Sequence, residues 1–83
     1  MARTIKIQVK LFASLAAYVP ENIDKDAWIV DAEEHVVLKD FLNQLNIPVD
    51  KVKLIFHNGV LAAGNEILKD KDRIGLFPAI AGG

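Results

Sequence analysis

The chain has 83 residues, and its ten basic and eleven acidic side chains leave a formal net charge of −1. This length suits one domain rather than two, since domains usually need roughly 100 residues and rarely fewer than about 50. The near-neutral charge argues against nucleic acid as a partner, and the absence of cysteine excludes a disulfide scaffold and thiolate metal sites while fitting a reducing cytosol.

The first predicted element is a strand over residues 4–11, because apolar and polar residues alternate strictly there. A second strand is expected around residues 27–32, after a connection over residues 12–26 that is rich in turn signals. The alternation leaves the register of this second strand open, because Trp28, Ile29 and Val30 are consecutive apolar residues.

An amphipathic helix of about three turns is predicted between Val36 and Leu45. Its apolar residues recur at helical spacing, at Val37, Leu38, Phe41, Leu42 and Leu45. Glu33 and Glu34 are expected at its start, where negative charge suits the helix dipole, and Pro48 is expected to stop it.

The second half of the chain predicts a hairpin and a final strand. Residues 52–57 alternate in polarity and are followed by Asn58-Gly59, a strong signal for a two-residue turn with a return strand from Val60. A charged turn is expected at residues 69–72. After it, Ile74, Leu76 and Phe77 provide the last strand.

This order of elements predicts an α+β fold, with one main helix packed across one face of a mixed sheet. The helix lies in the crossover between the second and third strands, which leaves room for parallel pairing of the first and last strands. We expect a single domain over residues 1–78 and a flexible tail over residues 79–83.

Side-chain catalysis is not indicated. His35 and His57 belong to different elements, and we expect the first near the helix start and the second on an exposed strand face, so no metal site is predicted. The carboxylate pairs at 33–34 and 70–72 are expected to be solvated. The sequence contains no phosphate-binding loop, so the chain is not expected to bind ATP or another cofactor itself.

The ending FPAIAGG is the most informative segment. Two glycines in the last two places would arise by chance in about one sequence in two hundred. Pro78 is expected to break strand pairing, and the five residues after it could reach about 17 Å when extended. Such a tail could enter a narrow channel on a partner.

Glycine leaves the terminal carbonyl accessible to another protein's groups, because it has no Cβ. A carboxylate is inert toward nucleophiles until its oxygen is turned into a good leaving group, as ATP-dependent adenylation would do. A sulfur nucleophile could then form a thiocarboxylate, whose ionised sulfur is itself a nucleophile. This chemistry needs only an unhindered C-terminus at Gly83.

The chain resembles the ThiS/MoaD sulfur-carrier family, which includes the thiamine-biosynthesis sulfur carrier and the small subunit of molybdopterin synthase. The resemblance rests on the segments VKLFA at residues 9–13, the helix over 36–45, Asn58-Gly59, residues 68–72 and the ending LFPAIAGG. It implies a ubiquitin-like β-grasp fold. It also implies a carrier or a small synthase subunit rather than an enzyme that performs the adenylation.

By this resemblance Gly83 is adenylated and thiocarboxylated, with Gly82 and Ala81 in the threaded tail. The implied partners are an ATP-using enzyme of the ubiquitin-activating type, a sulfur donor and an acceptor synthase subunit. Phe77 is expected to point outward because Ile74 and Leu76 share the opposite face. With its neighbours Pro78 and Ile80, it is the expected docking element.

Three functions remain open from the sequence. The first is a sulfur carrier for molybdopterin, a related tungsten cofactor or thiamine. The second is a protein modifier conjugated through Gly83, and the third is a β-grasp interaction module with an unused tail. No long apolar run opens the sequence, so we expect a cytoplasmic protein without membrane partners.

Overall fold

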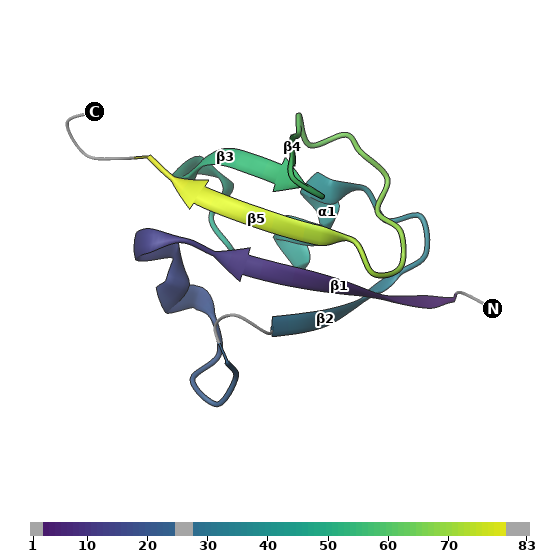
Figure 1. The fold of residues 1–83 in the computed structure, drawn as a ribbon, viewed down its shortest axis with the longest axis horizontal. Coiled ribbons are helices and arrows are strands. Elements are labelled where there is room, and N and C mark those ends of the chain that lie inside the picture. Colours follow the sequence, from purple (N-terminus) through teal and green to yellow (C-terminus); the bar gives the residue numbers. More distant parts are fainter. Residues whose placement is uncertain (1–2, 25–27, 80–83) are drawn as a thin grey trace.

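The computed structural model describes residues 3–24 and 28–79, which form one mixed sheet with helical segments between its strands (Figure 1). The elements in chain order are β1 (Thr4–Leu11), the 3-10 helix η1 (Ala13–Tyr18), β2 (Trp28–Glu33), α1 (Leu38–Gln44), the 3-10 helix η2 (Val49–Lys51), β3 (Val52–His57), β4 (Val60–Leu61) and β5 (Arg73–Pro78). Among the described residues, no helix is both long and apolar enough to cross a bilayer.

The five strands lie in the order β2-β1-β5-β3-β4. β1 and β5 pair in parallel, from Gln8 opposite Arg73 to Leu11 opposite Leu76, while the other pairings are antiparallel. The parallel pairing predicted for the first and last strands is therefore confirmed. It places the first and last strands side by side in the middle of the sheet, which is the β-grasp arrangement (Figure 1).

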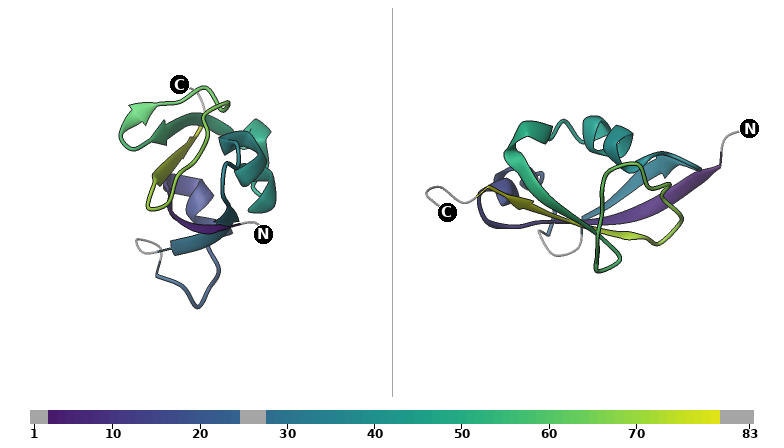
Figure 2. Two further views of the ribbon diagram at one scale, coloured as in Figure 1. Left: turned by 90° about the vertical axis from the view of Figure 1, so that its right-hand side faces the viewer. Right: turned by 90° about the horizontal axis from the view of Figure 1, so that it is seen from above.

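The hydrophobic core lies between the sheet and α1, which covers one face (Figure 2). The strict alternation of β1 puts every second residue into this core, and β5 adds Ile74 and Leu76. The fully buried side chains are Phe41, Ile7, Leu15, Leu38, Leu42, Leu68, Ile74, Leu76 and Val9. The predicted fold class and the apolar face of the helix are confirmed.

The start of α1 differs from the prediction, because the helix begins at Leu38 rather than Val36 and has seven residues, about two turns instead of three. Glu33 ends β2 and Glu34 lies in the following turn, so neither is in the first turn of the helix. Backbone carbonyls of a distant loop cap the helix instead. The Leu38 N–H donates to the Glu66 carbonyl at 2.8 Å and the Lys39 N–H to the Gly64 carbonyl at 3.0 Å. These hydrogen bonds satisfy two backbone N–H groups of the first turn, which have no partner within the helix itself.

The helix also stops before Pro48. Leu45 is its C-cap, and Asn46 has a φ of 59°, the left-handed conformation with which helices commonly end. Asparagine tolerates this conformation better than most residues. The predicted helix end was therefore correct in position, at Leu45, but wrong in cause.

The second strand begins at Trp28 and its register is now defined. Gln8 lies opposite Ile29 and Ile7 opposite Val30, so Trp28, Val30 and Ala32 face the core. Ile29 is 50% exposed on the other face. The predicted start at Ala27 lies outside the described residues.

The segment after β1 contains structure that its turn signals did not indicate. Residues 13–18 form η1, which buries Leu15, and Val19 after it is also buried. Residues 12–19 are mostly apolar, but so short a run gives no periodicity over a long window, so the sequence signal for this helix is weak.

The hairpin turn at Asn58-Gly59 is confirmed. Asn58 has a φ of 54° and Gly59 a φ of 83°. Positive values at both central residues are what a type I′ turn requires, and this turn type matches the twist of the flanking strands. The return strand β4 is only two residues long, so few ladder bonds hold the hairpin.

Candidate functional site

Three phenylalanine rings meet on the open face of the sheet, opposite α1. Phe12 follows β1, Phe56 comes from β3 and Phe77 from the end of β5. The rings of Phe12 and Phe77 stack with centroids 4.1 Å apart and planes 6° apart, and Phe56 meets Phe77 edge to face at 5.5 Å. These are favourable aromatic geometries. We call Phe12, Phe56 and Phe77 the ring cluster.

Strand pairing explains why rings so distant in sequence meet. Leu11 pairs with Leu76, which brings Phe12 beside Phe77, and Leu54 pairs with Phe77 across β3 and β5. Phe77 points outward as predicted, but it is half-buried rather than exposed. Its two aromatic neighbours cover much of it, and neither neighbour belongs to its own strand.

Next to the ring cluster lies an open hollow of about 500 Å³. Its lining residues are Gln8, Lys10, Phe12, Phe56, Gly59, Arg73, Ile74, Gly75 and Phe77. The hollow depends on Gly75, because a Cβ there would lie 3.4 Å from the Phe12 ring and 3.9 Å from the Phe56 Cβ. A larger side chain at this position would fill the space that a partner's side chain could enter.

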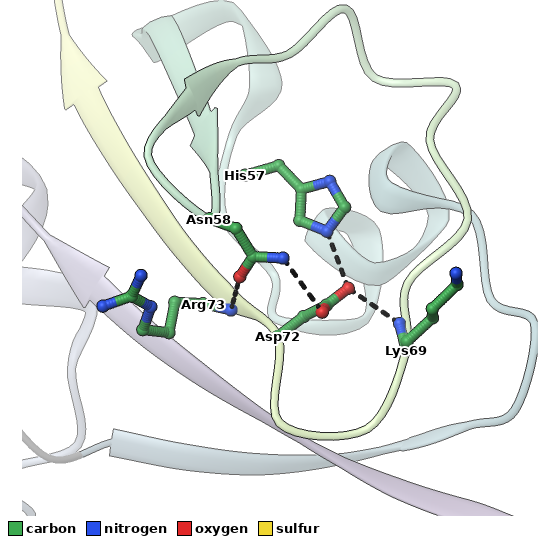
Figure 3. Close-up of polar contacts among 5 residues, drawn as sticks. All are labelled: His57, Asn58, Lys69, Asp72 and Arg73. Atoms are coloured by element: carbon green, nitrogen blue, oxygen red, sulfur yellow. Dashed lines mark hydrogen bonds and ion pairs between the residues drawn. The ribbon is translucent and has the colours of Figure 1, made fainter.

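The lining of the hollow combines aromatic carbon with two cations. The Lys10 ammonium lies 5.2 Å from the centroid of the Phe12 ring, within the range of a cation–π interaction. Arg73 lines the hollow from the first position of β5. Figure 3 shows its guanidinium pointing away from the polar contacts at the start of that strand. An apolar side chain flanked by acidic residues would complement this surface.

The chain leaves the sheet beside the ring cluster. Pro78 is the last residue of β5 and pairs with Val52, so it ends the strand rather than preventing its pairing. Ala79 is exposed. The other predicted tail residues, Ile80, Ala81, Gly82 and Gly83, lie outside the described residues, so the proposed reactive group and the domain boundary at residue 78 stay predictions.

Asp72 is the buried charged residue of the described chain, at 8% exposure, although the sequence indicated a solvated carboxylate. Its Oδ2 lies 2.6 Å from His57 Nε2 and accepts the Lys69 N–H at 2.8 Å, while its Oδ1 accepts the Asn58 Nδ2 at 3.0 Å (Figure 3). Because an ionised carboxylate only accepts, His57 carries its proton on Nε2.

The prediction of an exposed His57 was therefore also wrong. His57 pairs with Ile74 across β3 and β5, and Ile74 faces the core, so the histidine lies on the inner side of the sheet. A bulge between Val52 and Leu54 shifts the register of β3. The simple alternation read from Val52 does not account for this shift.

Burial alone would raise the pKa of Asp72, but the hydrogen bonds from His57, Asn58 and the Lys69 N–H together hold it below its ordinary value of 3.8. A carboxyl group whose pKa is lower in the folded state stabilises the fold while it is ionised. This contribution is complete above pH 3.8. It is lost as the pH falls through the folded-state pKa.

The Asp72→Asn variant should therefore be less stable than the wild type at neutral pH, and the difference should shrink in acid. Urea unfolding at about pH 6 and at a series of lower pH values measures how this difference in the free energy of unfolding changes as Asp72 becomes protonated. A difference that is the same at all of these pH values would contradict the role assigned to the ionised carboxylate.

The remaining ionisable groups do not assemble into a catalytic or metal centre within the described ranges. His35 is exposed in a turn before α1, with a φ of 72°, and its Nδ1 lies 3.8 Å from Glu34. Over residues 3–24 and 28–79, no three histidine or acidic side chains come together where they could hold a metal ion.

Sequence reasoning identified Phe77 but missed the rest of the hollow. Phe12 carried a signal, since it is a large apolar residue out of step with the core residues of β1, whereas Phe56 is in step with the apparent alternation of residues 52–57. Gly75 carried one too, as a glycine inside a strand, which often marks a close approach of another group. What was missing was the register that brings them together.

Comparison with known proteins agrees with this fold. Residues 4–82 match the family model described as Mut7-C ubiquitin. The solved structure of SAMP1 from Haloferax volcanii has a TM-score of 0.71 and 25% identity over 94% of this chain and 99% of that one. No curated protein sequence matches the chain at a significant level.

Two further solved structures are similar in fold. The HVO 2177 protein of Haloferax volcanii has a TM-score of 0.74 and 22% identity, over 96% of this chain and 88% of that one. A Pyrococcus furiosus protein described as molybdopterin converting factor, subunit 1, has a TM-score of 0.67 and 24% identity, over 92% and 99%. The predicted resemblance to ubiquitin-like proteins is confirmed, and with it the β-grasp fold, which the Pyrococcus furiosus protein shares.

Proposed function

Because the chain belongs to the Mut7-C ubiquitin family, we propose that it is a sulfur carrier whose Gly83 carboxylate is adenylated and then thiocarboxylated. The observation that supports this most is the position of the hollow beside the residue where β5 ends. A partner that binds the ring cluster holds the start of the tail. It can then receive the last residues in its own catalytic site.

The chemistry places few demands on this chain. A Gly83 carboxylate oxygen attacks the α-phosphorus of ATP in the partner's site, and pyrophosphate leaves. A sulfur nucleophile from a donor then attacks the acyl carbon, AMP departs, and sulfur takes the place of one carboxylate oxygen. The domain supplies recognition, and its glycine ending supplies access to the carbonyl.

The pathway that receives the sulfur is proposed to be molybdopterin or tungsten-cofactor synthesis, with thiamine synthesis as the alternative. The Phe77-Pro78 pair before the tail favours the first, as does the similarity to the Pyrococcus furiosus protein. The genes beside this one decide between them. A neighbouring large subunit of molybdopterin synthase would support the first, and thiazole-synthesis genes the second.

A protein modifier is the second candidate function. It is favoured by the similarity to SAMP1, another of whose solved structures is described as small archaeal modifier protein 1. The first steps are shared, because conjugation also begins with adenylation of the terminal carboxylate. The two functions differ in the nucleophile that finally takes the acyl group, which is sulfur in one and a lysine amine in the other.

Intact mass spectrometry of the protein isolated gently from its own cells separates these functions. A sulfur carrier is expected to show a fraction in which one sulfur replaces one oxygen at Gly83. Conjugates of higher mass joined through Gly83 would favour the modifier. A chain that is unmodified under all growth conditions would leave only an interaction module and overturn the proposal.

Replacing Phe77 by alanine should weaken binding to the activating enzyme by about 1–3 kcal/mol, as expected for an aromatic anchor. The loss of its two ring contacts should also lower fold stability, by about 0.5–1.5 kcal/mol for each aromatic pair. Titration calorimetry measures the affinity, and a thermal melt gives the folded fraction by which that affinity must be corrected.

Ile29→Ala provides the matched control for Phe77→Ala. Ile29 is an exposed apolar residue on the same face, but it belongs to the edge strand β2, opposite Gln8, and does not itself line the hollow. It should change neither affinity nor stability much. If Phe77→Ala lowers the melting temperature while folded molecules bind as the wild type does, the ring cluster is structural and the partner docks elsewhere.

A further inference from the structure

We propose that Asp72, acting through Asn58, holds Gly59 and Arg73 in place at the rim of the hollow, and is thereby a positioning residue for partner docking. The docking part of this inference rests on the proposed function. Asp72 itself does not line the hollow. Its influence must pass through the hydrogen bonds that connect it to residues that do.

Asn58 is the link between Asp72 and the rim. Its side-chain Nδ2 donates to Asp72 Oδ1 at 3.0 Å, and its Oδ1 accepts the Arg73 N–H at 2.8 Å (Figure 3). Its backbone N–H also donates to the Arg73 carbonyl at 2.8 Å. Asn58 therefore joins the hairpin turn to the first residue of β5 at two points, while Asp72 orients its amide.

The hairpin needs this support because its return strand, β4, has only two residues. β4 pairs with β3 through only two residue pairs, Phe56 with Leu61 and His57 with Val60. Two-stranded hairpins of this kind are marginally stable by themselves. The exposed side chains of Val60 and Leu61, at 68% and 62%, add little packing. The hydrogen bonds from Asn58 thus fix the position of Gly59 at the rim of the hollow.

The carboxylate of Asp72 is in turn fixed from two other elements. His57 contacts it from β3, and the Lys69 N–H contacts it from the preceding turn. A further charge that interacts electrostatically with His57 is that of Glu66, whose carboxylate accepts the Ala63 and Gly64 N–H groups. The guanidinium of Arg73 points away from this group of residues (Figure 3).

Asn58→Gly is the sharpest test of the link. Glycine adopts the positive φ of a type I′ turn without strain, so the turn is retained while the side-chain bridge is removed. Affinity for the purified activating enzyme of the same organism should fall by about three- to tenfold, the factor that one hydrogen bond typically contributes. Asp72→Asn should act in the same direction.

Asp70→Asn is the matched control. Asp70 lies two residues before Asp72 in the same turn, but its carboxylate accepts the Lys6 N–H at 2.8 Å, whereas the Asn58 amide donates to Asp72. Its removal should leave docking within about twofold of the wild type. Equal losses for Asp70→Asn and Asn58→Gly would show a general effect of the turn and overturn the proposal, as would wild-type affinity in Asn58→Gly.

Amide proton shifts followed through an acid titration test the link without any partner. In the wild type, the Lys69 N–H reports protonation of Asp72 directly, and the Gly59 N–H reports it through Asn58. Arg73 is unsuitable as a reporter because its N–H adjoins Asp72 in the chain. Asn58→Gly should abolish the Gly59 response and preserve that of Lys69. A residue with a merely structural role would not produce this selective loss.

The two measurements separate failure of this inference from failure of the proposed function. If the wild-type protein does not bind the activating enzyme, the proposed function is overturned, and the selective loss of the Gly59 response alone then decides whether Asp72 positions the rim. If the wild type binds but Gly59 still follows Asp72 in Asn58→Gly, the inference is overturned while the proposed function stands.

Discussion

A chain that lacks Gly83, or that carries one residue beyond it, is expected to lose adenylation completely while its fold is unchanged. The carboxylate would be displaced by one residue, about 3.3–3.6 Å along an extended chain, from the position in which the partner's site activates it. Displacements of about 1 Å can already reduce reaction rates a hundredfold. ATP–pyrophosphate exchange with the activating enzyme measures the loss.

A one-residue extension before Met1 is the matched control for this experiment. Because β1 and β5 are parallel, the start of β1 at Thr4 and the end of β5 at Pro78 lie at opposite ends of the sheet. The N-terminal extension should therefore leave exchange unchanged. Exchange at the wild-type rate in either C-terminal variant would show that Gly83 is not the activated residue, whatever the state of the ring cluster.

Leu38→Ala and Leu42→Ala are each expected to lower the free energy of unfolding by about 2–5 kcal/mol. The two side chains are 0% and 1% exposed, so each substitution would leave a cavity between α1 and the sheet. The helix has only seven residues and depends on tertiary packing, since isolated helices of this length are unstable in water. Urea unfolding at neutral pH measures the loss.

Asn43→Ala on the exposed side of α1 controls for general effects of helix substitution. It removes no core contact and should change the free energy of unfolding by less than about 0.5 kcal/mol. If both leucine variants unfolded at the same urea concentration as the wild type, the packing of α1 described here would be incorrect. Their folded fractions should still be adenylated, because neither residue reaches the hollow.

Local patterns in the sequence determined most of the fold. The strict alternation of residues 4–11 specified β1 with its correct bounds, since a period of two can bury only one face. Helical spacing identified the buried side of α1, and Asn58-Gly59 identified the turn. Each of these signals acts between residues a few positions apart. Such short-range patterns can therefore be read without a structure.

The caps of α1 and the environments of the ionisable groups could not be read in this way. Carbonyls from residues 64 and 66 cap a helix that begins at Leu38. His57 was expected on an exposed face, but β5 and the turn before it bring Asp72 to its ring. Local capping rules and residue spacing contain no information about a partner that arrives from another part of the chain.

The sequence by itself thus determined the five strands, the helix α1, the fold class and the glycine ending as the candidate reactive group. Only the tertiary structure decided the surface beside that ending. Phe12, Phe56 and Phe77 are separated by 20 residues or more along the chain, and they meet because β5 lies between β1 and β3. Long-range strand pairing depends on the whole core. This pairing brings the three rings and Gly75 together, and they line the hollow.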